Sequence, residues 1–485
     1  MLSMDGVPLQ QILEPGEYRV QWQVPDQTGQ IVSLDGDLTI AADRPPRGHT
    51  IGDLLTVWDD VEGTRHATFP QVYELEAVRG TLLNGMTVLL PDARVEAWIS
   101  DRAIIDAPAA LIGHDDETRA ESTVAALEVQ VRGLDAMTGI APIARVQIPR
   151  PPAGTRHLDW KWGAEGNPDS TQVWADDDAE VKLKFYSSVS APEGFFYRVT
   201  FSPVVLIKLT TPIPLEQALR EWIEPLRRIV SLSTGRQEPI TYLAVGITRS
   251  EDADRQPLQV YGSGIQQQPF ASRANDIRAI RRSFQVSPND MSLLDLLRAW
   301  QKLRDDHHPL LETYADMMYA PTQHPRSQLL LLLQALEGLH GHETQQEYAT
   351  RSAGHTTSRD SALAELVGKI STAAMKFIKA NLARRPATSL DRVLRDTIAG
   401  LPKDLTSNLA ATPLVQAAMT DPRQPNSPYD ALRIIRNDLA HGTRGYPAHD
   451  IHDVARLLDR VVRAHLLRLL GCASSSIERE LDRDQ

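Results

Sequence analysis

The spacing of apolar residues changes once along this 485-residue chain, and that change limits the fold more than any other feature. Up to about residue 270, apolar and polar residues alternate in short runs, as in EYRVQWQV (17–24), which is typical of half-buried β-strands. Beyond Met291, apolar residues recur at three- and four-residue intervals, which is typical of helices. We therefore expect an α+β protein, in which a β-rich domain precedes an all-α helical bundle.

Two segments of the β-rich part carry more specific signals. Asn84-Gly85 lies between two apolar runs, a pattern that predicts a tight hairpin. The segment 214–235 (PLEQALREWIEPLRRIVSLSTG) has helical spacing and ends at a glycine. Strands followed by one amphipathic helix predict a sandwich-like β domain with a packed helix. We place this domain at residues 1–280, a helical connector at 281–323 and the helical domain at 324–485.

Helices are expected over six segments of the C-terminal part. Their apolar spacing and flanking Ser, Pro and Gly residues place them at 292–304, 327–340, 361–384, 389–399, 428–441 and 448–470.

Charge and cysteine content narrow the function classes. The net charge is −12, which disfavours a general nucleic-acid binder. Residues 324–485 hold 21 Lys and Arg against 18 Asp and Glu, a net +3, so the acidity lies in the preceding part at −15. The single cysteine, Cys472, fits a reducing compartment. The start lacks the features of a signal peptide, and no apolar run approaches the roughly 20 residues of a membrane span. We expect a cytoplasmic protein that does not enter a membrane.

The stretch IIRNDLAHGTRGY (434–446) holds the candidate chemistry, at the end of a well-bounded helix. Ser427 is a suitable N-cap, Pro428 suits the first helical position, and Gly442 suits the C-terminal cap. At about 100° per residue, Arg436 falls inside the apolar arc, where its guanidinium needs a partner or a cleft. Asn437 and His441 are four residues apart and share a face, so Asn437 is expected to orient the imidazole.

An arginine and a histidine at this distance are not by themselves specific. With four to six intervening residues allowed, similar pairs recur at Arg444/His449, Arg460/His465 and Arg150/His157. His465 continues an apolar stripe and is expected in a core, whereas the other two pairs lie in loop segments. The pair at 436 and 441 differs because an asparagine follows the arginine and the helix ends at the histidine.

The helix expected at 327–340 adds one narrow polar stripe to an otherwise apolar surface. Gln334, Glu337 and His340 recur every three residues along it. The stripe either faces solvent, or it brings Glu337 to Arg436 or to a catalytic histidine across the bundle.

These stretches together resemble a known family. Arg436, Asn437 and His441 match the R-N-x-x-x-H signature of HEPN domains, which are helical bundles and often metal-independent ribonucleases. The run SQLLLLLQALEGLHGH (327–342) resembles the first HEPN helix of ApeA-type anti-phage proteins, and the β-rich part with the helix at 214–235 resembles their N-terminal domain. The resemblance spans most of the chain.

The resemblance implies a function and a site. It implies an endoribonuclease of anti-phage defence that cleaves cellular RNA, with tRNA among the candidates, by attack of the 2′-OH. Arg436, Asn437 and His441 would be catalytic together with Glu337, and no metal or cofactor would be needed. HEPN nucleases commonly join two motifs at a homodimer interface, and the N-terminal domain would sense an unidentified phage trigger. The alternative is a non-catalytic HEPN-like module that regulates a partner, in which Arg436 and Glu337 form a structural ion pair.

Overall fold

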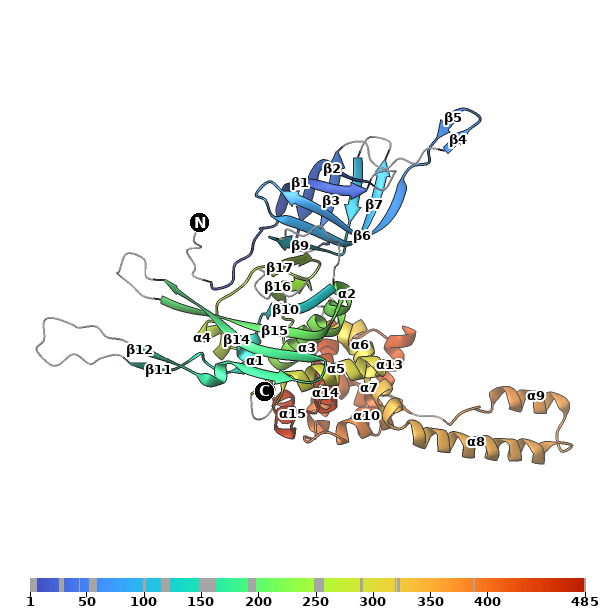
Figure 1. Ribbon diagram of the computed structural model, residues 1–485. Coiled ribbons are helices and arrows are strands. Elements are labelled where there is room, and N and C mark those ends of the chain that lie inside the picture. Colours follow the sequence, from blue (N-terminus) through green and yellow to red (C-terminus); the bar gives the residue numbers. More distant parts are fainter. Residues whose placement is uncertain are drawn as a thin grey trace, which may run out of the picture. The chain divides into compact units, whose positions relative to one another are not determined.

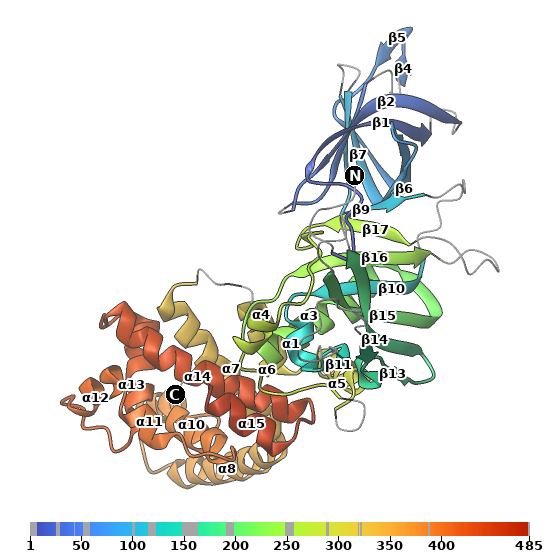
Figure 2. The same cartoon turned by 90° about the vertical axis from the view of Figure 1, so that its left-hand side faces the viewer.

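The protein is α+β and forms two compact units, Met1–Leu297 and Arg298–Gln485 (Figures 1 and 2). The boundary between the units falls inside the segment 281–323 that the sequence suggested as a connector. The computed structural model describes residues 7–25, 30–42, 44–51, 59–98, 102–114, 123–147, 163–190, 198–247, 257–287, 291–318, 320, 323–386 and 389–483.

Six antiparallel strands close into a barrel at the start of the first unit (blue in Figure 1). In barrel order they are β7 (Thr87–Trp98), β6 (Gln71–Leu82), β1 (Gly16–Pro25), β2 (Ile31–Ile40), β3 (Arg47–Ile51) and β8 (Arg102–Asp106). β8 pairs with both β3 and β7, which closes the ring. The expected hairpin at Asn84-Gly85 is confirmed, because Gly85 turns the chain between β6 and β7 with φ +82°.

The expectation of a sandwich is corrected by this closure, and Trp22 gives the physical reason. Its indole is fully buried in the barrel and donates a hydrogen bond to the carbonyl oxygen of His49 at 2.9 Å. A Cβ atom added at Gly36, Gly48 or Gly80 would come within 2.9 Å of an indole atom. Glycines on β2, β3 and β6 thus let three strands approach one large side chain, so the sheet curls around it instead of packing on a second sheet.

The same sheet continues beyond the barrel as an open antiparallel sheet. From β7 it runs through β9 (Ala109–Gly113), β17 (Leu258–Gly262), β16 (Ile240–Ile247), β10 (Thr123–Val131), β15 (Arg198–Pro214), β14 (Ala179–Ser190) and β13 (Gln172–Ala175). Two short hairpins, β4 (Asp59–Val61) with β5 (Thr64–His66) and β11 (Ile143–Gln147) with β12 (Gly163–Gly166), stand apart from it.

The helix expected at 214–235 is present as three consecutive pieces. They are α2 (Leu215–Ala218), the single π-helical turn η3 (Leu219–Ile223) and α3 (Glu224–Thr234), which ends at Gly235 with φ +71°. α2 packs against β10 and β15. The shorter helices of this unit are α1 (Leu134–Thr138), the 3-10 turn η1 (Pro168–Ser170) and α4 (Ala274–Arg278), and α5 (Leu293–Asp305) crosses the boundary between the units.

The second unit is helical, and α7 (Pro325–Glu343) contacts most of its major helices. It packs against α6 (Pro309–Met317), α10 (Leu390–Ala399), α13 (Pro428–His441) and α14 (Ala448–Leu469). The remaining helices are α8 (Gln345–Leu366), α9 (Thr372–Asn381), α11 (Thr406–Ala410), α12 (Pro413–Met419) and α15 (Ser474–Leu481). In the described part of the chain, no helix is long and apolar enough to cross a membrane.

Most expected helices of this unit lie within a few residues of their predicted bounds, but the helix expected at 361–384 is wrong. Residues 361–366 are instead the end of α8, and α9 begins only at Thr372. Gly368 separates the two with φ +79°, a left-handed conformation that breaks the helical path. α8 was missed because its first four turns are polar and have no apolar spacing.

Candidate functional site

Helix α13 carries the candidate motif, and its ends are fixed as the sequence suggested. The Oγ atom of Ser427 accepts a hydrogen bond from the backbone N–H of Asp430 at 3.2 Å. Gly442 closes the other end with φ +68°, and its N–H bonds to the carbonyl oxygen of Asp438. The helix buries Leu432, Ile435 and Leu439, so its rotation about its own axis is set by core packing.

Arg436 and Glu337 meet between α13 and α7. Nη2 of Arg436 lies 3.4 Å from Oε2 of Glu337, and the two side chains are 37% and 34% exposed. Nη1 of Arg436 also donates to Oδ1 of Asn437 at 3.3 Å. The prediction that an arginine in the apolar arc needs a partner is therefore confirmed. One edge of the guanidinium stays open to solvent, because the side chain is only half-buried.

The expected contact between Asn437 and His441 is not formed. The side-chain oxygen of Asn437 accepts from Arg436 instead, because the long guanidinium side chain can bend over to it along the helix surface. The His441 side chain is exposed at the end of α13, and it forms no hydrogen bond or ion pair within the part of the chain that the structure describes. Asn437 therefore positions the arginine rather than the imidazole.

Asp438, which sequence reasoning passed over, is the most heavily bonded side chain of the motif. Its two oxygens accept from Nη1 and Nη2 of Arg423 at 2.9 and 2.8 Å. They also accept from the hydroxyls of Thr443 at 3.0 Å and of Tyr446 at 2.7 Å. The hydrogen bonds from Arg423 hold the pKa of the Asp438 carboxyl well below its usual range. Burial, together with this carboxylate, raises the pKa of Tyr446 to about 12.

These bonds fix the chain on both sides of His441. Arg423 lies in the loop before α13, whereas Thr443 and Tyr446 lie in the loop after it, so one buried carboxylate holds both loops. A second acidic residue, Asp421, binds Arg423 and Arg444. The sequence places one arginine in each loop and Tyr446 in the second, but no local pattern links them to Asp438.

A further cation lies at the C-terminal end of α13. The side chain of Arg326, in the first turn of α7, donates to the backbone carbonyl oxygen of Leu439. Helix C-termini carry partial negative charge, so this guanidinium both caps the helix and brings a positive charge to the turn that bears His441.

The remaining histidines of this region have other environments. His340 is buried and its Nε2 lies 3.2 Å from a carboxylate oxygen of Asp396, so the polar stripe of α7 faces α13 at Glu337 and α10 at His340. His465 is buried and bonded to the carbonyl oxygen of Thr397, and burial lowers its pKa to about 4. The core position predicted for His465 is confirmed. His449 is 82% exposed beside Asp450.

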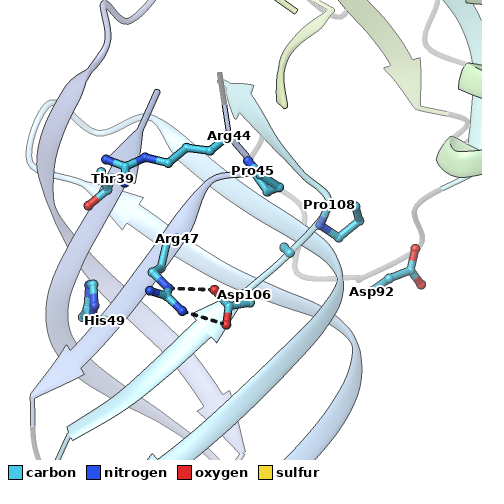
Figure 3. Close-up of a pocket in the computed structure, with 9 residues that line it drawn as sticks. Thr39, Arg44, Pro45, Arg47, His49, Asp92, Asp106 and Pro108 are labelled. Carbon is cyan, nitrogen blue, oxygen red and sulfur yellow. Dashed lines mark hydrogen bonds and ion pairs between the residues drawn. The ribbon is translucent and has the colours of Figure 1, made fainter. Parts of the chain in front are cut away.

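A cavity of about 640 Å³ opens on the barrel of the first unit (Figure 3). Arg47 and Asp106, which pair across β3 and β8, form a double hydrogen bond of 2.8 and 3.3 Å in its wall. The other lining residues are Thr39, Arg44, Pro45, His49, Asp92, Ala107 and Pro108. Two arginines are balanced by two aspartates, so the lining suits a polar ligand without strongly favouring one sign of charge.

The chain matches no protein-family model, no curated protein and no solved structure. The chemistry must therefore be inferred from the residues themselves.

Proposed function

We propose that the helical unit is a metal-independent endoribonuclease of the HEPN type, acting in anti-phage defence. The observation that carries the proposal is that one helix holds a positioned guanidinium and, five residues later, an exposed imidazole. Glu337 and Asn437 hold Arg436, and His441 stands at the solvent-exposed end of α13. RNA brings its own nucleophile, the 2′-OH, so the enzyme needs a proton-transfer group and a cation for the phosphorane charge.

Each residue then has a distinct role. His441 acts as general base on the 2′-OH or as general acid on the leaving 5′-oxygen, because an imidazole can both accept and donate a proton. Arg436 holds the scissile phosphate through the guanidinium edge that Glu337 and Asn437 leave free. Glu337 and Asn437 are positioning residues. The products are a 2′,3′-cyclic phosphate and a 5′-OH end.

A homodimer through the helical unit completes the site in this proposal. Arg436 and His441 are five residues apart, which separates them by roughly 140° around α13. One copy therefore presents the two groups in different directions, and a second α13 supplies the missing partner on each side of the cleft. The acidic first unit repels RNA, so we assign it to sensing the phage trigger and restraining the nuclease. The substrate in this proposal is cellular RNA, such as tRNA.

The second candidate function is a non-catalytic helical module that regulates a partner, and one observation favours it. Arg436 already has an acidic partner in Glu337, and a histidine at a helix C-terminus is stabilised by the helix dipole without any catalytic role. The double variant Glu337→Arg/Arg436→Glu separates the two functions, because it keeps an ion pair between α7 and α13 with its polarity reversed. A nuclease loses cleavage in this variant although it folds, whereas a module that uses the pair only structurally keeps its effect in cells.

The direct test of the proposed chemistry is His441→Ala with a matched histidine control. Loss of a proton-transfer group typically slows a reaction about 10²–10⁴-fold, and an exposed helix-end side chain contributes little to stability. We therefore expect His441→Ala to remove RNA cleavage and cell toxicity at unchanged thermal stability. His449→Ala is the control because it is exposed and lies one loop away. Equal activity of both variants and the wild type would reject His441 as the catalytic group.

A further inference from the structure

The segment 367–386 is the most basic stretch of the helical unit. It holds five cationic side chains and no Asp or Glu, and we call it the basic arm: Lys369, Lys376, Lys379, Arg384 and Arg385. Residues 324–485 carry a net charge of +3, so the rest of this region without the arm is at −2. The net positive charge of residues 324–485 thus comes from these twenty residues.

All five cations are exposed, and none forms an ion pair with another residue in the described part of the chain. α9, which forms the centre of the arm, has no buried residue. Figure 1 shows α8 and α9 projecting away from the other helices of the unit. An isolated helix of ten residues is marginal in water, because nucleation costs more than so few turns return. A binding partner would supply the packing that α9 lacks.

The exposed side chains of α9 indicate the chemistry of that partner. Phe377 is 68% exposed and directly follows Lys376 in the sequence. Lys376 and Lys379 are three residues apart, so they share one face of the helix beside the aromatic ring. Met375 and Ile378 are already half-buried, so the helix offers one open aromatic ring beside a face with two lysines rather than a continuous apolar face. Aromatic rings that stack on bases beside cations that contact phosphates are how proteins bind single-stranded nucleic acids without sequence preference.

We propose that the basic arm binds single-stranded RNA and delivers it to the α13 site; this rests on the nuclease function proposed above. α8 connects the arm directly to α7, which carries both Glu337 and Arg326. The 22 residues of α8 extend over roughly 33 Å at 1.5 Å per residue. A strand stacked at about 3.4 Å per nucleotide needs on the order of ten nucleotides to cover that distance. RNA longer than about ten nucleotides can therefore contact the arm and the α13 site together, and we expect it to bind more tightly than shorter RNA.

α8 provides an internal control for exposure and charge. It is almost as exposed as α9, with only Leu363 buried, but it carries two arginines against three acidic residues. The variant Lys376→Gln/Lys379→Gln removes two charges from the arm, and Gln345→Glu/Gln346→Glu lowers the net charge by the same amount on exposed positions of α8. Because none of the four side chains is buried, both variants are expected to fold, which circular dichroism verifies.

The experiment measures binding of the full-length protein to a fluorescein-labelled, 30-nucleotide 2′-O-methyl RNA by anisotropy across a salt series. The 2′-O-methyl group blocks cleavage, so binding is read separately from catalysis. We expect Lys376→Gln/Lys379→Gln to weaken binding and to reduce the slope of log K against log salt by roughly 1.4, since a single strand contributes about 0.7 per phosphate contact. Phe377→Ala should weaken binding roughly 5-fold or more. Gln345→Glu/Gln346→Glu should leave the slope unchanged.

Three outcomes overturn the assignment. The two charge variants could weaken binding equally, which would make it a property of net charge alone. The lysine variant could leave RNA binding intact but lose sedimentation with phosphatidylserine vesicles, which would make the arm a membrane-surface element. It could also change only the oligomeric state, which would make the arm a contact between copies. Cleavage of a six-nucleotide RNA, too short to reach the arm, tests the nuclease independently: we expect the lysine variant to cleave it at the wild-type rate.

Discussion

Replacing Asp438 by asparagine tests whether the loops around His441 are held by one buried carboxylate. The asparagine has the same shape, but its NH₂ group cannot accept a hydrogen bond. Oδ1 accepts from Arg423 and Thr443, whereas Oδ2 accepts from Arg423 and Tyr446. Whichever way the amide is oriented, one bond from Arg423 is lost, and one hydroxyl must accept from the NH₂ group instead of donating. The Arg423 nitrogen on that side then faces the positive edge of an NH₂ group instead of a carboxylate oxygen.

The expected loss of stability follows from these bonds. A hydrogen bond to a charged group contributes about 1.5–3 kcal/mol, and both bonds between Arg423 and Asp438 are affected, one by its loss and one by removal of the negative charge, which gives about 3–6 kcal/mol at most. The Arg423 side chain is 45% exposed, so water replaces part of its interaction and the lower end applies. We expect Asp438→Asn to lower the free energy of unfolding by about 3 kcal/mol, or the melting temperature of the helical unit by roughly 6–12 °C.

The difference between wild type and variant should depend on pH in one direction. The folded-state pKa of Asp438 is depressed, so its stabilising contribution is fully present above the unfolded value of about 3.9. That contribution is lost as pH falls below about 4 toward the folded pKa. Urea denaturation of both proteins between pH 7 and pH 3 measures this difference. Asp453→Asn, at an exposed position on α14, should change stability by less than about 0.5 kcal/mol. A difference for Asp438→Asn that is equally small, or that is constant down to pH 3, would refute the reasoning.

Three further predictions concern the rest of the molecule. Burial lowers the pKa of His465 to about 4, so the folded state resists protonation and the free energy of unfolding should decline as pH falls from 6.5 to 4. In urea titrations at each pH, this decline should be smaller in His465→Gln than in the wild type, by up to about 3 kcal/mol. Light scattering at micromolar concentration should give twice the 53.8-kDa chain mass, and a pure monomer would remove the composite site. Deleting residues 1–280 should leave a soluble helical fragment with higher basal cleavage, and an insoluble fragment under all conditions would argue against separable units.

Local signals in the sequence were sufficient for α13. Its N-cap at Ser427, its C-terminal Gly442 and its apolar arc all depend on residues within a few positions of one another, and each was predicted correctly. The sequence alone did not decide whether Glu337 pairs with Arg436, because the two residues are 99 positions apart and only packing of α7 on α13 brings them together.

Features that depend on distant residues could not be predicted. Closure of the barrel requires Gly36, Gly48 and Gly80 to meet one indole, and nothing in the alternating pattern of any single strand reveals that register. The bonds of Asp438 were missed because Arg423 lies in an irregular loop. Helical geometry alone predicted a contact between Asn437 and His441. In the structure the side chain of Asn437 instead accepts from Arg436, whose guanidinium reaches over the helix surface.

The end groups of the cleaved RNA test the central claim most directly. Purified protein is incubated with total RNA in EDTA, and the products are treated with enzymes that distinguish 3′ and 5′ ends. Attack by the 2′-OH predicts 2′,3′-cyclic phosphates and 5′-OH ends without divalent metal, in wild type and in His449→Ala but not in His441→Ala. Cleavage that requires Mg²⁺ and leaves 3′-OH and 5′-phosphate ends would contradict the proposed roles of Arg436 and His441.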